Sequence, residues 1–326
     1  MTPRRHFLLA AASAMAWPFA AAAQQPGRTY RLGWLDATTG RDQSYQVAFD
    51  LRLRELGFAQ GRNLVIEFRT TAGQAARLPE LAATLARLNC DAILVPAPEA
   101  GLVAMKQASK DVPIVFIAND YDPVSTGHVA QLARPGGRIT GVSQLQAELP
   151  AKRLQVLKEL IPSLRRVGVL ADEATVGQLR VSQVAAQQLG IELLVHAFTQ
   201  TPYDYAGAFG TLARGKVEAL LVLASGNFVS ARRLIPELAL RHRLPSLFNN
   251  YLWTEAGGLL SYGPNFVQTY RRAADQVAKV LGGANPGEIA VEQSDAVELV
   301  INLKTARSLG INLPQSLRLR SDRTIE

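Results

Sequence analysis

Cysteine and histidine are scarce in this chain of 326 residues. The single cysteine, Cys90, has no partner for an internal disulfide, and no Cys/His pairs have the spacing of metal ligands. We interpret Cys90, which stands just before an apolar strand, as a small core residue. These absences exclude a disulfide scaffold and a zinc module, and we expect no bound metal.

The motifs of several enzyme classes are also missing. No G-x-S-x-G elbow presents a nucleophile, and no G-x-x-x-x-G-K-[ST] loop is present to cradle a phosphate. No G-x-G-x-x-G follows the first expected strand. Two glycine pairs, Gly136-Gly137 and Gly257-Gly258, stand before strands, which is the wrong context for a nucleotide site. The sequence therefore predicts a protein that is not an enzyme and uses no cofactor.

Positive charge is in modest excess and is not clustered. The chain has 35 Lys and Arg against 27 Asp and Glu, a formal net charge of +8. Nucleic-acid-binding proteins normally concentrate such an excess in an arm or stripe, so we expect no nucleic-acid partner. Hydrophobic residues make up 48% of the chain, too many for intrinsic disorder. The length fits two domains of ordinary size.

The N-terminus has the features of an export signal. Arg4 and Arg5 precede an uncharged apolar run to Ala23, with the RR-x-F-L spacing of a twin-arginine signal and small residues at the expected cleavage site. The alternative, a transmembrane helix, is disfavoured because the run is too short. We predict a signal peptide at 1–23, cleaved near Ala23 after export by either the twin-arginine or the general secretory route. The mature protein is expected to be periplasmic and not embedded in the membrane.

Short apolar strands alternate with amphipathic helical segments along the rest of the chain. A first series of expected strands covers 30–35, 63–68, 91–95 and 113–118, and a second covers 166–170, 191–198, 217–223 and 246–248. Apolar strands that alternate with helices are typical of parallel sheets covered on both faces. We therefore predict an α/β fold of two Rossmann-like lobes with parallel sheets.

Two glycine-rich junctions, at 134–143 and 255–264, are the candidate crossings between the lobes. The periodic helix expected from 266 to 281 then returns the chain to the first lobe. We predict a multi-strand hinge that closes around a ligand, the alternative being that both junctions are ordinary surface loops. The predicted partition assigns 27–138 plus 252–288 to the N-terminal lobe, and 139–251 plus 289–326 to the C-terminal lobe.

Ligands of open α/β sheets bind at the carboxyl ends of the strands, beside helix N-termini. This rule, with the first junction, selects the candidate ligand-binding residues Asp36, Thr38, Thr39, Ala97, Pro98, Glu99, Asn119, Asp120, Ser143, Glu173, Ser225, Asn227, Asn249 and Tyr251. Tyr251 or Trp34 is a candidate to stack on a flat ligand. The threonines and Asn227 have helix capping as an alternative role, and Glu99 has the helix dipole.

Acidic residues recur among these candidates. Asp36, Glu99, Asp120 and Glu173 would form an acidic mouth if all pointed inward. Such a mouth favours a ligand that carries an amine over a purely anionic one.

Three stretches of the sequence carry a family resemblance. They are PIVFIANDYDPVSTGHVAQLARPGGRITGVS, EAGGLLSYGPN and VELVINLKTARSLGINLPQSL. With the leader ending in AAAQQP, they make the chain resemble the ABC-transporter substrate-binding proteins of the tryptophan-binding-like "ABC sub bind" group, over nearly all of its mature length. The sequence departs from the group's commoner small residues at Asp36 and Glu99.

The resemblance implies a type I periplasmic-binding-protein fold with a three-strand hinge and with 297–309 added back to the second lobe. It also implies delivery of a small solute to an ABC permease and its ATPase, and some relatives bind aromatic amino acids. We therefore predict a monomeric periplasmic solute-binding component of an ABC importer, for an amino acid or aromatic-type compound. The alternative is a ligand-sensing protein that presents its closed form to a membrane receptor. The same fold serves repressor effector domains, but the chain begins with an export signal rather than a helix-turn-helix.

Overall fold

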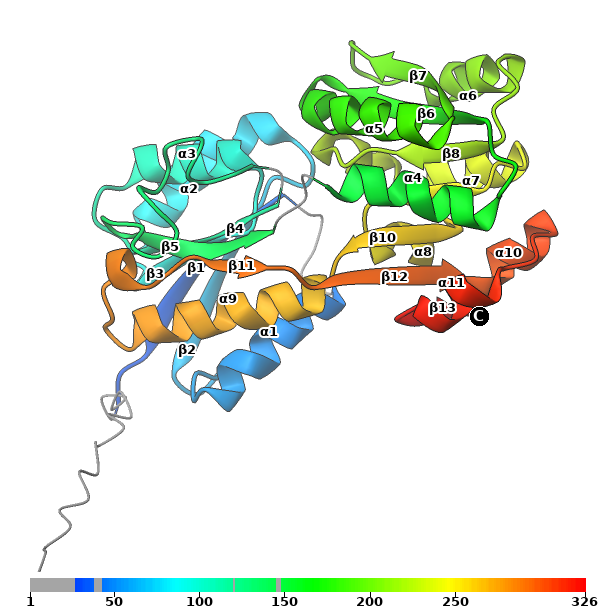
Figure 1. Ribbon diagram of the computed structural model, residues 1–326. Coiled ribbons are helices and arrows are strands. Elements are labelled where there is room, and N and C mark those ends of the chain that lie inside the picture. Colours follow the sequence, from blue (N-terminus) through cyan, green and yellow to red (C-terminus); the bar gives the residue numbers. More distant parts are fainter. Residues whose placement is uncertain (1–26, 38–42, 120, 145–147) are drawn as a thin grey trace, which may run out of the picture.

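The computed structural model describes residues 27–37, 43–119, 121–144 and 148–326. Within these ranges the protein is formed by two α/β lobes side by side, each built on its own sheet (Figure 1). The predicted fold class is therefore correct.

The first sheet is parallel throughout, in the order β11-β5-β4-β3-β1-β2. Its strands are β1 (Tyr30–Asp36), β2 (Leu64–Thr70), β3 (Ala92–Val95), β4 (Ile114–Ala118), β5 (Ile139–Gln144) and β11 (Glu292–Ser294). Its helices are α1 (Ser44–Glu55), α2 (Leu78–Ala86), α3 (Glu99–Ala108) and α9 (Phe266–Leu281). Helices α1 and α9 cover one face of this sheet, and α2 and α3 cover the other (Figure 1).

The second sheet has the order β13-β12-β10-β9-β8-β6-β7, with only β10 and β12 pairing antiparallel among the described strands. Its strands are β6 (Arg166–Asp172), β7 (Glu192–Phe198), β8 (Ala219–Val222), β9 (Ser246–Phe248), β10 (Leu260–Pro264), β12 (Val297–Asn302) and β13 (Arg323–Ile325). Its helices are α4 (Leu149–Leu160), α5 (Val176–Leu189), α6 (Tyr205–Arg214), α7 (Leu234–Arg241), α8 (Tyr251–Glu255), α10 (Leu303–Leu309) and α11 (Gln315–Arg320).

The central strands are apolar on both faces because both faces are covered. In β3, Leu94 packs into the core under α1 and α9, whereas Ile93 and Val95 pack into the core under α2 and α3. Cys90 belongs to this second core, and burial raises the pKa of its thiol to about 11. The thiol is therefore protonated at neutral pH and acts as a small core group, as the sequence indicates.

The chain passes between the lobes three times, between β5 and α4, between β10 and α9, and between β11 and β12. The two sheets divide the chain differently from the predicted partition. Strands β5 and β11 complete the first sheet, although the partition gave 139–144 and 292–294 to the second lobe. Conversely, α8 and β10 belong to the second lobe. Each glycine-rich junction contains a strand that is paired on both sides, β5 in the first sheet and β10 in the second, and the chain crosses only after each strand ends.

A buried arginine ties α4 to the strand β10 next to one of these crossings. Arg153 is fully buried, and its Nε donates a hydrogen bond of 2.8 Å to the carbonyl oxygen of Tyr262. Burial lowers the pKa of the guanidinium to about 9. Its two terminal nitrogens have no hydrogen-bond partner among the described residues. The second lobe therefore holds a buried cationic side chain between the first turns of α4 and β10.

Glu298, near the start of β12, makes protein stability depend on pH. Burial raises the pKa of its carboxyl to about 7; Arg323 opposes this shift, and Asp322 and Glu255 add to it. Because the pKa is higher in the folded than in the unfolded chain, the folded state binds more protons between about pH 4.5 and 7. Stability attributable to Glu298 is therefore lost as the pH rises through this interval.

The variant Glu298→Gln is expected to be more stable than the wild type above pH 7, with the difference vanishing below pH 4.5. Urea unfolding at a series of pH values measures this directly. The exposed Glu173→Gln is the control and should show no such pH-dependent gain. A constant difference between Glu298→Gln and wild type from pH 4 to 8 would contradict the assignment.

Candidate functional site

A cleft of about 180 Å³ lies between the two lobes. The described residues that line it are Asp36, Ala37, Tyr45, Pro96, Pro98, Asn119, Ala224, Ser225, Gly226, Val229, Arg232, Asn249, Asn250, Leu252, Trp253, Phe266 and Tyr270. The lobes approach each other across it, because a Cβ on Gly226 would lie 3.9 Å from Cγ of Pro98. Residues of both lobes thus form the walls of this cleft.

Five of the predicted site residues line this cleft: Asp36, Pro98, Asn119, Ser225 and Asn249. Asp36 is the last residue of β1, and Asn119 and Asn249 directly follow β4 and β9. Pro98 and Ser225 are the N-caps of α3 and of the 3-10 helix η3 (Gly226–Ala231). The strand-end rule therefore found side chains from both lobes. Thr38, Thr39 and Asp120 lie outside the described residues.

Other predicted site residues do not line the cleft. Ala97 and Ser143 are buried in the first lobe, and Glu173 is exposed in the turn after β6. Asn227 donates from Nδ2 to Asp172 at 3.0 Å and to the Tyr203 hydroxyl at 3.3 Å. It therefore braces the cleft wall, and it is not among the described residues that line the cleft.

Tyr251 and Trp34 do not offer their rings to a ligand. Trp34 is fully buried, with its ring 4.9 Å from that of Phe49. The Tyr251 ring is buried under the Arg323 guanidinium, 4.7 Å from its centre, and its hydroxyl lies 2.6 Å from the Ser44 hydroxyl. Burial raises the pKa of Tyr251 to about 12. Both rings support the site from within the packed interior.

The predicted acidic mouth is not assembled by the described residues. Glu99 turns away from the cleft and lies 2.9 Å from Nε2 of His128, and Glu173 is exposed. Of the four predicted acidic residues, Asp36 is the one that lines the cleft within the described part of the chain, since Asp120 lies outside it. Its buried carboxylate accepts hydrogen bonds from Trp34 Nε1 at 2.9 Å and from Gln46 Nε2 at 3.4 Å. These donors fix the direction of one carboxylate at the carboxyl end of the sheet.

Aromatic residues form the part of the cleft wall that the sequence analysis missed. Tyr45, Phe266 and Tyr270 come from α1 and α9, and Trp253 comes from α8. The Tyr45 ring lies 4.5 Å from Tyr270 and 5.7 Å from Phe266. Phe266 and Tyr270 continue the apolar stripe of α9, which the sequence predicts only as a periodic helix. Their proximity to the hinge crossing was the one available signal, because α9 starts directly after it.

A hydrogen-bonded cluster fixes the second-lobe wall. Asp172 caps the turn after β6 by accepting from the amide of Ala174, and it also accepts from the hydroxyl of Ser225. Ser225 in turn caps η3. The residues that follow, Val229 and Arg232, therefore reach the cleft from a segment anchored to the sheet.

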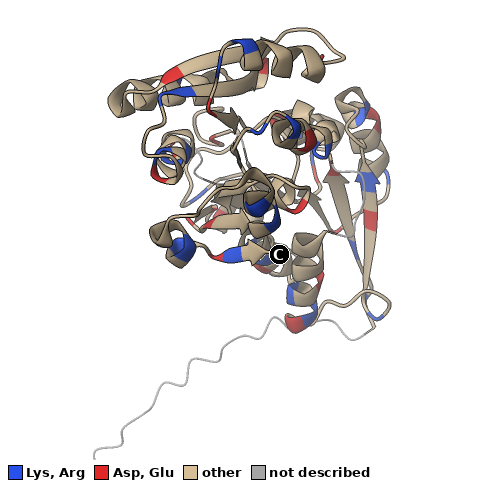
Figure 2. Cartoon of the chain, turned by 90° about the vertical axis from the view of Figure 1, so that its right-hand side faces the viewer, with Lys and Arg blue, Asp and Glu red and all other residues tan. Residues whose placement is uncertain are grey.

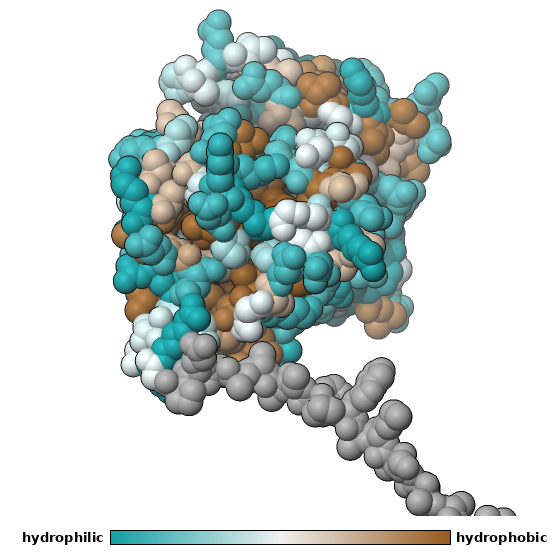
Figure 3. Space-filling model, turned by 90° about the vertical axis from the view of Figure 1, so that its left-hand side faces the viewer, coloured by the Kyte–Doolittle hydropathy of each residue, from teal (hydrophilic) through white to brown (hydrophobic). Residues whose placement is uncertain are grey.

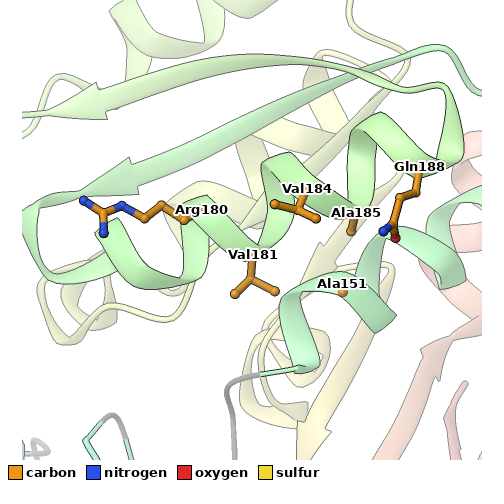
Figure 4. Close-up of a pocket in the computed structure, with 6 residues that line it drawn as sticks. All are labelled: Ala151, Arg180, Val181, Val184, Ala185 and Gln188. Carbon is orange, nitrogen blue, oxygen red and sulfur yellow. The ribbon is translucent and has the colours of Figure 1, made fainter.

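A second concavity, of about 310 Å³, lies outside the cleft, between α4 and α5. Its described lining is Ala151, Arg180, Val181, Val184, Ala185 and Gln188, and in Figure 4 Arg180 extends away from the other five. Two helices of one lobe form it, so hinge closure cannot enclose a ligand there. The inter-lobe cleft is the better candidate site although it is smaller.

The surface carries charge of both signs. On the face shown in Figure 2, Lys and Arg are interspersed with Asp and Glu. On the opposite face, hydrophilic side chains predominate, with hydrophobic ones scattered between them (Figure 3). None of the described helices is long and apolar enough to cross a bilayer. No group of three His, Cys, Asp or Glu within the described ranges is placed to hold a metal ion.

Comparison with known proteins identifies the family of the chain and finds solved structures with the same fold. The family model for ABC transporter substrate binding protein matches residues 40–325. A tyrosine-binding protein of Clostridioides difficile is 26% identical over 263 residues, which is 79% of this chain and 74% of that protein. A conserved domain protein from Vibrio cholerae has a TM-score of 0.79 at 25% identity, covering 91% of this chain and 100% of that one. An ABC domain from Streptococcus pneumonia in complex with L-Trp has a TM-score of 0.75 at 21% identity, covering 90% and 100%.

Proposed function

Because this chain belongs to the family of ABC transporter substrate-binding proteins, we propose that it is the periplasmic solute-binding component of an ABC importer. Its ligand in this proposal is an aromatic amino acid or a closely related amine. The mature protein, released by cleavage near Ala23, carries this solute as a monomer to a membrane permease driven by a cytoplasmic ATPase. The family match and the signal peptide predicted at 1–23 support this proposal.

The proposed ligand class rests on one observation: a carboxylate of fixed direction and several aromatic rings line the same cleft. Asp36 offers a buried negative charge, which suits an ammonium group. Phe266, which is half-buried, offers apolar surface for a ring, and the buried rings of Tyr45 and Trp253 also line the cleft. A mostly apolar cleft with few directed polar groups is the usual form of a small-molecule site. The tyrosine-binding relative and the L-Trp complex agree with this class.

Binding without chemistry is what this arrangement supports. Asp36 accepts hydrogen bonds from Trp34 and Gln46, and the described residues that line the cleft include no histidine or cysteine. A nucleophile with an oriented base is the minimum for covalent catalysis. The free energy of ligand contacts with both lobes is thus available for hinge closure, which a permease recognises.

The test is calorimetric titration of residues 24–326 with L-tyrosine, L-tryptophan, L-leucine, benzoate and glucose. We expect saturable 1:1 binding of the aromatic amino acids and weaker binding of leucine. Benzoate, which lacks the ammonium group, should bind poorly. Preferred binding of glucose or benzoate would contradict the proposed ligand class.

Removing one cleft ring should weaken binding without unfolding the protein. Phe266→Ala deletes a half-buried ring and is expected to cost about 1.5 kcal/mol, or roughly tenfold in Kd for L-tyrosine. Val184→Ala removes an exposed side chain from the outer α4–α5 groove and serves as the matched control. Weaker binding by Val184→Ala, with Phe266→Ala unchanged, would transfer the ligand site to that groove.

A further inference from the structure

Two charged residues stand among the described residues that line the inter-lobe cleft, and they have opposite signs. Asp36 belongs to the first lobe and Arg232 to the second. The rest of the described lining is uncharged. A ligand that bears both a positive and a negative group therefore meets one complementary charge on each lobe.

Arg232 is available to such a ligand. Its side chain is half-buried, and it forms no hydrogen bond or ion pair with another described residue. Most other arginines near acidic side chains are paired, as Arg323 is with Glu255 at 3.0 Å. A guanidinium presents parallel N–H donors that match the two oxygens of a carboxylate. Partial burial in an apolar cleft strengthens this pairing relative to an exposed ion pair.

The segment that carries Arg232 is positioned before any ligand arrives. Ser225 caps η3 and is itself bonded to Asp172, and the Arg232 amide donates to the carbonyl oxygen of Val229 at 3.2 Å. Such an anchored backbone lowers the cost of ordering a flexible arginine on binding. Arg233, the next residue, is exposed and does not line the cleft.

We propose that Arg232 binds the carboxylate of the solute, so that the cleft selects a zwitterion and couples hinge closure to the presence of both charged groups. This inference rests on the proposed function and names the substrate class more narrowly. An amine without a carboxylate engages the charge of the first lobe alone. It therefore gains less from closure, because a ligand shifts a conformational equilibrium only by its differential contacts with the two states.

Three ligands that share a phenol ring test the contribution of each charged group. L-tyrosine carries both groups, tyramine lacks the carboxylate, and 3-(4-hydroxyphenyl)propionate lacks the amine. Each is titrated calorimetrically into the wild type, Arg232→Gln and Arg233→Gln. We expect the wild type to bind L-tyrosine most tightly. Arg232→Gln should lower the affinity for L-tyrosine at least tenfold and leave the affinity for tyramine unchanged. Arg233→Gln should bind all three ligands with the affinities of the wild type.

Small-angle scattering supplies the conformational readout. L-tyrosine should reduce the radius of gyration of the wild type, whereas tyramine at saturation should reduce it less. Saturating L-tyrosine should reduce the radius of gyration of Arg232→Gln only as much as tyramine reduces that of the wild type.

The outcomes separate this inference from the proposed function. If the wild type binds tyramine as tightly as L-tyrosine, the proposed amine site stands and the role of Arg232 is overturned. Equal weakening of both ligands by Arg232→Gln would show a merely structural residue and would also overturn it. If the wild type binds none of the three, the proposed ligand class fails and the carboxylate assignment fails with it.

Discussion

Asp36→Asn is expected to abolish most of the affinity for an amino-acid ligand while leaving the protein folded. The substitution keeps the shape and an acceptor oxygen for Trp34 Nε1, but it removes the negative charge that faces the cleft. Loss of one partner of a buried charge pair costs about 2–5 kcal/mol, which corresponds to roughly 30-fold or more in Kd. Calorimetric titration with L-tyrosine measures this loss.

Glu173→Gln is the matched control for this experiment, because it removes an exposed carboxylate that was predicted to belong to the same mouth. Its affinity should equal that of the wild type. The ligand 3-(4-hydroxyphenyl)propionate, which has no amine, should gain rather than lose affinity in Asp36→Asn, since the repulsion between two carboxylates is removed. Unchanged L-tyrosine binding by Asp36→Asn would take Asp36 out of the site.

Among substitutions that add one methyl group near the crossings between the lobes, we expect Gly263→Ala to destabilise the protein most. Gly263 lies in β10, one residue before the strand ends and two before the chain crosses to α9. A Cβ there would overlap the carbonyl oxygen of Asn249 and lie 2.7 Å from its carbonyl carbon. Both are backbone atoms, so β10 itself must shift, and Asn249 is part of the cleft wall.

We expect Gly263→Ala to lower the unfolding free energy by about 3 kcal/mol, as overpacking against fixed atoms does. That corresponds to a fall in Tm of roughly 6–12 °C for a domain of this size. Differential scanning calorimetry without ligand measures it. Gly177→Ala is the matched control: no atom lies within 4 Å of its added Cβ, and alanine favours the helix α5. A Tm for Gly263→Ala equal to that of Gly177→Ala would contradict the predicted clash.

The strand-end rule worked for Asp36, Asn119 and Asn249 because backbone topology alone places these residues. In a parallel sheet every strand ends at the same edge, so a residue that follows a strand lies at that edge whatever its side chain does. The rule gives no side-chain direction. Glu99 also lies at this edge, but it turns toward His128, which a separate loop supplies.

The aromatic wall was missed because core packing and cleft lining have the same helical period. Phe266, Tyr270 and Val277 lie on one apolar face of α9, and Val277 is buried against the first sheet. Where that face passes the sheet edge, its side chains face the cleft instead. The residue at which the apolar face passes the sheet edge depends on how α9 is placed on the sheet. The helical period of the sequence does not specify that placement.

The sequence by itself determined the α/β class, the two series of strands and the strand ends from which the site is built. These follow from local patterning, because apolar runs and helical periods are readable over ten to twenty residues. The tertiary structure decided which side chains line the cleft and where the lobes divide. The Tyr251 hydroxyl is hydrogen-bonded to that of Ser44, 207 residues away in sequence, and this contact holds the ring outside the cleft. Likewise, β5 joins the first sheet by pairing with β4. Such contacts join distant segments, so they exist only once both lobes have packed.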